Sequence, residues 1–173
     1  MPDILHRLTI HAPPERVFEA LTTAEGIRNW WTRDADLDAR IGGAGKFRFY
    51  GGSGVTSVRV DALDAPHRVG WTTLSANAPG GWDGTTITFE LSVDGSDTVL
   101  SFAHRGFAEA NEGYALVTTG WAYYLVSLQH SRRNWKRRAA SGKGFRADAS
   151  LMLKTPVMRR RFRAFGRRSR AFR

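Results

Sequence analysis

The order of sequence periodicities predicts an α+β domain in which a curved antiparallel sheet wraps around a long C-terminal helix. A strand pattern comes first, two short helical patterns follow, then five more strand patterns and finally one long helical pattern. Turn residues, not helices, separate the later strands, which favours antiparallel hairpins over a parallel βαβ arrangement. Each strand pattern alternates apolar and polar residues, so we expect one face of the sheet to contact water.

The first three elements are a strand and two short helices. Residues 4–10, ILHRLTI, place apolar side chains close to every second position, which is the period of a half-buried strand. Two prolines then interrupt this pattern. Proline is favoured in the first turn of a helix, so we expect a helix over residues 14–22. A second short helix is expected over residues 25–30.

Five further strands are expected before the last helix. Apolar residues recur at every second position in them, as Phe47 and Phe49 do in the first and Ile87 and Phe89 in a later one. Gly-Gly, Asp-Ala-Pro and Asp-Gly stretches separate the strands at hairpin-like intervals. The predicted strands cover residues 46–50, 57–62, 68–73, 86–93 and 98–104.

The last predicted element is a long helix that begins after Gly113. Its apolar residues return with a period of about 3.6 and form one stripe, and Ser141-Gly142 is a suitable end. No other predicted element is long enough to cover the sheet, so we expect the stripe to lie against the concave face. The stripe consists of Leu116, Val117, Trp121, Tyr124, Leu125, Leu128, Trp135 and Ala139.

The net charge of +10 is concentrated near the C-terminus. Residues 1–130 contain 10 Lys and Arg against 15 Asp and Glu, whereas residues 131–173 contain 16 against 1. We therefore expect a domain over residues 1–144 and a basic, disordered tail over residues 145–173. Arginines interleaved with phenylalanines in the tail would suit nucleic acid or an anionic membrane surface. A solvated tail without a dedicated partner is the alternative.

Composition and spacing argue against several functional classes. The chain has no cysteine, which excludes disulfides, thiolate metal sites and cysteine nucleophiles. There is no signal-like start and no apolar run of membrane-spanning length, so we expect a cytoplasmic protein. The five histidines are scattered without metal-ligand spacing, and we expect no metal and no cofactor. The sequence shows no recognisable catalytic constellation of nucleophile, base and oxyanion donors.

Four ordered segments resemble a known superfamily. They are HAPPERVFEALTTAEGIRNWWT (11–32), IGGAGKFRFYGG (41–52), LSFAHRGF (100–107) and GWAYYLVSLQ (120–129). Together they resemble the START-like (SRPBCC, helix-grip) superfamily, most of all its branch homologous to the activator of the heat-shock-protein-90 ATPase. The resemblance implies a six- or seven-stranded sheet that grips the last helix. It also implies a cavity that accepts small apolar molecules in many relatives, while others are cyclases, lipid carriers or co-chaperone domains.

The predicted ligand site lies between the sheet and the last helix. We expect a small hydrophobic ligand there, contacted by side chains on inward faces or at the mouth of the cavity. The expected lining is Trp31, Phe47, Trp71, Phe102, His104, Trp121 and Tyr124. The competing interpretation is that these residues are simply core. A chaperone partner is the alternative protein-binding function, and the oligomeric state is left open.

His104 allows two interpretations. Alternation places it on the same face as Leu100 and Phe102, so its ring should point inward. An inward imidazole could hydrogen-bond a ligand, or act as the general base of a cyclase-like enzyme. Alternatively, it is a core histidine whose ring nitrogens are satisfied by a hydroxyl or a backbone carbonyl.

Overall fold

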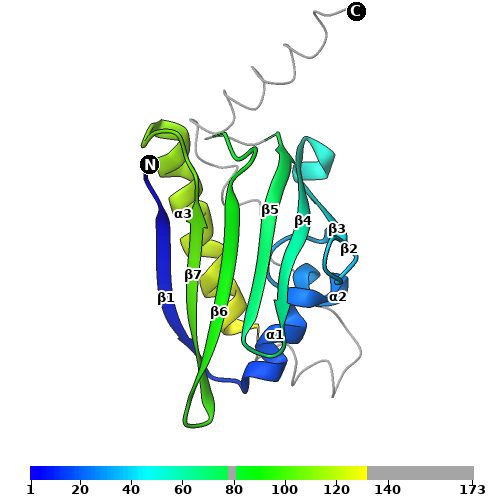
Figure 1. The fold of residues 1–173 in the computed structure, drawn as a ribbon, viewed down its shortest axis with the longest axis vertical. Coiled ribbons are helices and arrows are strands. Elements are labelled where there is room, and N and C mark those ends of the chain that lie inside the picture. Colours follow the sequence, from blue (N-terminus) through cyan, green and yellow to red (C-terminus); the bar gives the residue numbers. More distant parts are fainter. Residues whose placement is uncertain (78–80, 132–173) are drawn as a thin grey trace, which may run out of the picture.

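The computed structural model describes residues 1–77 and 81–131. It shows seven strands in one antiparallel sheet, with the order β1-β7-β6-β5-β4-β3-β2. A long helix, α3, crosses one face of this curved sheet, and two short helices lie near its lower end (Figure 1). This is the predicted α+β helix-grip fold. The last helix was predicted to continue past Ser131 and to end at Ser141-Gly142. That part of the helix lies outside the described residues, and so does the basic tail.

Six of the seven strands match predicted strands. β1 has the predicted bounds, β3, β6 and β7 differ from theirs by one or two residues at an end, and the hairpin of β4 and β5 extends further than predicted. The strands are β1 (Ile4–Ile10), β2 (Asp34–Leu37), β3 (Ala44–Phe49), β4 (Gly54–Asp64), β5 (Arg68–Ala76), β6 (Thr86–Asp94) and β7 (Asp97–Arg105). A single 3₁₀ turn, Tyr50–Gly52, links β3 to β4.

The short strand β2 was not predicted. It pairs with β3 at one edge of the sheet, and its sequence is Asp-Ala-Asp-Leu. The two acidic side chains face outward, where Arg48 Nη1 lies 2.8 Å from carboxylate oxygens of both Asp34 and Asp36. Ala35, between them, is fully buried. Acidic residues are uncommon in strands, so the propensity of this segment hides the alternation.

The two short helices connect the two edges of the sheet. α1 (Pro14–Thr22) and α2 (Ala24–Arg28) follow β1 at one edge and precede β2 at the other. The Thr23 hydroxyl caps α2 by accepting a hydrogen bond from the Gly26 N–H at 2.9 Å, which satisfies one of the free donors at the helix start. The Trp30 indole N–H donates to the Ala20 carbonyl at 3.0 Å and fastens the two helices together.

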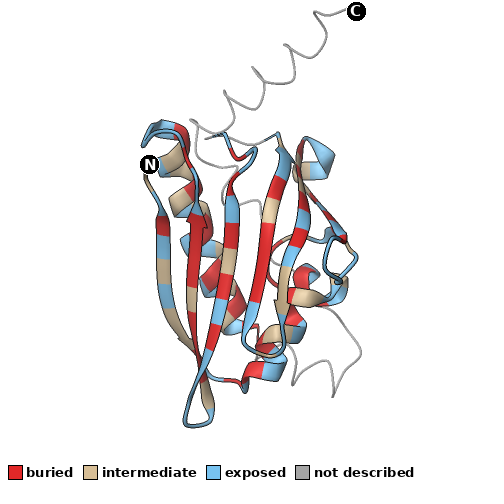
Figure 2. Ribbon diagram, in the orientation of Figure 1, coloured by how far each residue is buried: buried red, intermediate tan, exposed pale blue. Residues whose placement is uncertain are grey.

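Helix α3 (Glu112–His130) begins at Asn111, whose side chain accepts a hydrogen bond from the Tyr114 N–H. Its buried residues fall at intervals of three or four, as the predicted stripe requires. They are Gly113, Val117, Trp121, Leu125 and Leu128. Buried positions alternate with less buried ones along most of β3, β4 and β6, whereas β5 and β7 are buried at several consecutive positions (Figure 2). Among the described residues, no helix is long and apolar enough to span a membrane.

Candidate functional site

The space between the sheet and α3 is filled by a continuous cluster of aromatic rings. The ring centre of Trp121 on α3 lies 4.5 Å from that of Phe102 on β7 and 5.1 Å from that of Trp31. Trp31 stacks on Trp71 at 5.9 Å and contacts Phe47 at 4.6 Å. These separations are typical of favourable aromatic pairs. All five residues are at most 5% exposed, so their rings pack against one another and have almost no contact with solvent.

His104 forms the polar centre of this cluster. Trp121 Nε1–H donates to its Nδ1 at 2.9 Å, and its Nε2 lies 2.8 Å from the Thr85 hydroxyl. Because an indole N–H can only donate, Nδ1 carries the lone pair and Nε2 carries the proton. The Thr85 hydroxyl in turn donates to the carbonyl of Trp82. In this hydrogen-bond network of Trp121, His104 and Thr85, every polar hydrogen therefore has an acceptor.

Burial lowers the pKa of His104 to about 3, so the ring is neutral at ordinary pH. His104 is 0% exposed, and no carboxylate in the described part of the chain opposes this effect. A general base needs a lone pair within reach of a substrate, and the only lone pair of His104 accepts the indole proton of Trp121. This geometry is that of a core histidine with both ring nitrogens bonded, and it leaves no free lone pair for a general base; both interpretations remain predictions.

Tyr124, the seventh predicted lining residue, lies at the rim of the cluster. Its ring centre is 6.2 Å from that of Phe49, and its hydroxyl hydrogen-bonds with that of Tyr50. Burial raises the pKa of both tyrosines. Tyr50 has a φ of 53°, a left-handed conformation that non-glycine residues seldom adopt. The structure thus brings six of the predicted residues together inside and places Tyr124 at the end near β3.

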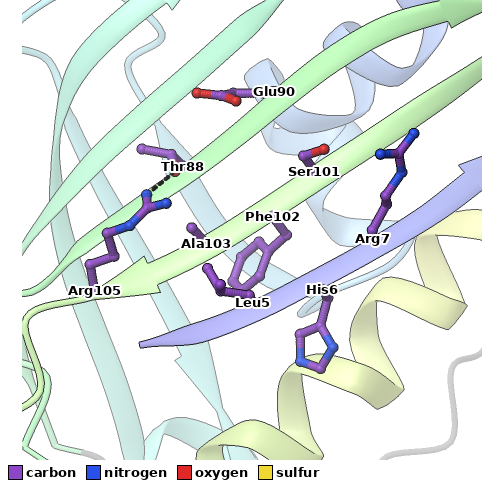
Figure 3. Close-up of a pocket in the computed structure, with 9 residues that line it drawn as sticks. All are labelled: Leu5, His6, Arg7, Thr88, Glu90, Ser101, Phe102, Ala103 and Arg105. Carbon is purple, nitrogen blue, oxygen red and sulfur yellow. Dashed lines mark hydrogen bonds between the residues drawn. The ribbon is translucent and has the colours of Figure 1, made fainter. Parts of the chain in front are cut away.

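A second candidate site is a hollow of about 310 Å³ on the opposite face of the sheet, over β1, β7 and β6 (Figure 3). Arg7 and Arg105 lie at opposite ends of it, and Glu90 borders its far side. Arg105 contacts the Thr88 hydroxyl at 3.4 Å and Asp3 at 3.4 Å. Within residues 1–77 and 81–131, neither Arg7 nor Glu90 forms an ion pair.

The sequence did not reveal the hollow, and it did not reveal two residues of the hydrogen-bond network around His104, Trp82 and Thr85. Trp82 and Thr85 belong to a glycine-rich connection, GGWDGTT, that follows neither a helical nor a strand period. The alternation of β7 does place Ser101, Ala103 and Arg105 on the face opposite α3, and small residues at a sheet surface could have indicated a depression there. In the described part of the chain, no group of three His, Asp or Glu side chains is arranged to hold a metal ion.

The comparisons with known proteins agree on one family. Residues 11–131 match the model of the family described as "Activator of Hsp90 ATPase homolog 1-like protein". The Aha1 dimer from Colwellia psychrerythraea is 37% identical to the chain, with a TM-score of 0.66, and the match covers 75% of this chain and 94% of that one. No curated protein matches the chain.

Two more distant solved structures support the fold alone. A protein from Mesorhizobium loti is 22% identical with a TM-score of 0.68, and the match covers 77% of this chain and 98% of that one. An HSP90 activator from Plasmodium falciparum is 21% identical with a TM-score of 0.60, covering 73% and 93%. Each match covers nearly the whole length of the solved structure, so the shared helix-grip architecture extends over nearly all of both relatives.

Proposed function

The chain belongs to the Activator of Hsp90 ATPase homolog 1-like family, and on that premise we propose that it is a protein-binding domain whose partner is an Hsp90-type chaperone. The observation that carries this proposal is the contrast between a closed interior and an open outer face. The rings between sheet and α3 fill their own space, whereas the hollow over β1, β7 and β6 is open to a partner. The relative from Colwellia psychrerythraea is a dimer, so self-association is included in this role.

The outer hollow has the chemistry of a transient protein interface. Leu5 exposes 61% of its surface beside the charged side chains of Arg7 and Glu90. Such interfaces combine apolar contacts with polar groups and are about as apolar as the rest of a protein surface. Arg7 and Glu90, which form no ion pair with any described residue, could each gain a counter-charge from a partner, which would favour the correct orientation of binding.

The test is stimulation of the ATPase of an Hsp90-type chaperone from the same organism by the full-length protein. The informative variant is Ser101→Arg, because Ser101 lies in the hollow and a long side chain there would fill it without touching the core. We expect the wild type to raise the ATPase rate and Ser101→Arg to need at least about tenfold more protein for the same effect.

Ser92→Arg is the matched control for that experiment. Ser92 is an exposed serine on the neighbouring strand β6 and lies outside the hollow, so this variant should stimulate like the wild type. A wild-type protein that neither binds nor stimulates the chaperone would overturn the proposal. Equal loss in both variants would remove the hollow as the binding surface.

A second candidate is the binding of a small hydrophobic molecule between sheet and α3. The observation that favours it is the aromatic rim, where Tyr50 holds a left-handed backbone conformation beside the half-buried Tyr124. Unusual backbone conformations of this kind often occur at ligand sites. A guest entering there would meet Phe49 first and Trp31 behind it, and these two rings would have to separate because their centres lie 5.5 Å apart.

Native mass spectrometry of the purified full-length protein tests this second candidate. A retained guest would appear as a mass in excess of the polypeptide that disappears on denaturation. Tyr124→Ala should lose the guest while keeping the fold, whereas Tyr123→Ala, on the exposed side of the same helix, should retain it. A spectrum of the bare polypeptide, together with no change in tryptophan fluorescence on adding apolar probes, would count against this candidate.

A further inference from the structure

The free edge of β1 is only partly covered by α3. Among the described strands, β1 lies at the edge of the sheet and pairs only with β7. Two α3 side chains bond its other edge: the Tyr114 hydroxyl donates to the Asp3 carbonyl at 2.8 Å, and the Gln129 amide donates to the Thr9 carbonyl at 2.7 Å. Backbone groups of an antiparallel strand point alternately to its two sides. The odd-numbered residues of β1 therefore direct their N–H and C=O groups to this edge.

Leu5 and Arg7 are the odd-numbered residues between those two bonds. Neither residue has a hydrogen bond from its edge-facing N–H or C=O to any other described residue. Both side chains are exposed, and they border the outer hollow (Figure 3). Unpaired edge groups beside an exposed apolar side chain are a template for a further strand. Four backbone groups are thus available over the length of three residues.

We propose that two copies of the chain pair through this edge, with β1 antiparallel to β1 and a two-fold axis at His6. In this register Leu5 of one copy lies opposite Arg7 of the other. Because both residues direct their backbone groups to the edge, each of the two Leu5–Arg7 pairs exchanges two hydrogen bonds, four in all. The bonds from Tyr114 and Gln129 limit the pairing to this central part, and the interface uses the same patch on both copies.

One pair of opposite charges on the outer face fits this register, although the two Arg7 side chains also lie diagonally across the axis from each other. Arg7 of one copy lies diagonally across from Asp3 of the second copy, within reach of a long side chain. Arg7 forms no ion pair inside the described part of the monomer, and Asp3 meets only Arg105, at 3.4 Å. An unrelated extended peptide would have to supply this carboxylate by chance. A second copy supplies it by symmetry, which is why we assign the edge to self-pairing.

His6 lies on the other face of β1, towards α3. Its Nε2 is buried and has no hydrogen-bond partner among the described residues, while its other nitrogen bonds the Thr118 backbone. A buried polar atom without a partner calls for an explanation. In the proposed register the two His6 residues are direct neighbours across the axis, although each Nε2 is buried inside its own copy and gains no partner from the pairing.

Sedimentation of the full-length protein alone tests the pairing, with Arg7→Pro as the decisive variant. Proline lacks the N–H, and at this position the N–H faces the open edge, so the ladder to β7 keeps all its bonds. We expect the wild type to dimerise and Arg7→Pro to raise the dimer Kd by at least about 30-fold, because two of the four hydrogen bonds are lost. Circular dichroism and Tm should stay close to wild type.

Arg7→Ala is the matched control, since it removes the charge but keeps the N–H. It should weaken the dimer only a few-fold. If Arg7→Pro does not fold, Leu5→Pro removes the equivalent edge donor. Association could also arise from the basic residues 131–173. Measurements at about 0.15 M and 0.5 M NaCl separate it from backbone pairing, because salt strongly screens only the interactions of the basic residues.

A monomeric wild type at high micromolar concentration, an Arg7→Pro dimer as tight as wild type, or a dimer that dissociates at the higher salt would each overturn the pairing. The inference rests on the proposed function only in treating self-association as part of protein binding. The two can fail separately. A salt-resistant dimer without ATPase stimulation would leave the pairing intact and remove the chaperone, whereas stimulation by a monomeric protein would do the reverse.

Discussion

The aromatic interior and the β1 edge differ in how completely their polar groups are bonded. Inside, both nitrogens of His104 and the hydroxyl of Thr85 have partners. At the edge, the outward backbone groups of Leu5 and Arg7 have none in the described part of the chain. Satisfied buried networks make a fold rigid and specific, whereas unsatisfied groups mark surfaces that gain by contact. We therefore expect a partner to bind at the surface in preference to the interior.

Truncation of Trp121 should give the largest effect. Trp121→Ala removes a ring that is 2% exposed and the N–H that His104 accepts, so we expect the free energy of unfolding to fall by about 3–5 kcal/mol. Urea denaturation followed by circular dichroism measures this loss. Tyr123→Ala, on the exposed side of the same helix, should cost less than about 1 kcal/mol. A loss of similar size in both variants would mean that the interior is not tightly packed.

Acid should weaken the interior through His104. Its pKa is lowered from 6.5 to about 3 in the folded state, so only the unfolded chain binds a proton between these values. Stability is therefore complete above pH 6.5 and falls as the pH drops. Between pH 7 and pH 5 the loss from this residue should be about 2 kcal/mol.

The control for this pH effect is His104→Gln, which can accept from Trp121 and donate to Thr85 but does not titrate. The remaining histidines, including His6 with its lowered pKa, are common to both proteins and cancel in the comparison. Urea unfolding at the two pH values gives the difference. If wild type and variant lose the same stability on acidification, His104 is not the buried neutral group described above.

The smallest effect is expected at the covered part of the edge. Tyr114→Phe deletes the donor to the Asp3 carbonyl but keeps the ring against Phe107 at 5.2 Å. Water can replace the lost bond at this exposed carbonyl, so we expect a cost of about 1 kcal/mol or less. The same urea assay measures it. A loss above about 2 kcal/mol would show that this edge contributes to stability as the interior does.

Most of the fold was predictable because six of the seven strands carry a readable period of their own. Phe47, Val60, Phe89 and Phe102 alternate with polar residues, and burial of one face follows directly from that alternation. β2 was missed because two aspartates dominate its four residues. Its pairing depends on Arg48 of the next strand, which local sequence does not reveal.

The candidate site was predictable only in part. Period and order brought Trp31, Trp71 and Trp121 to one interior, yet the partners of His104 could not be inferred. Trp82 and Thr85 come from a connection without periodicity, and their burial depends on contact with His104 and Trp121. The open edge also escaped prediction, because it depends on which strand lies outermost and on where two α3 side chains reach.

The sequence by itself determined which side chains face inward and in what order strands and helices follow, since both depend on local spacing and on turn residues. Tertiary structure alone decided which polar atoms find partners. Hydrogen bonds between residues far apart in the chain, such as Trp121 to His104 and Gln129 to Thr9, depend on the packed distance between α3 and the sheet. No local period encodes that distance.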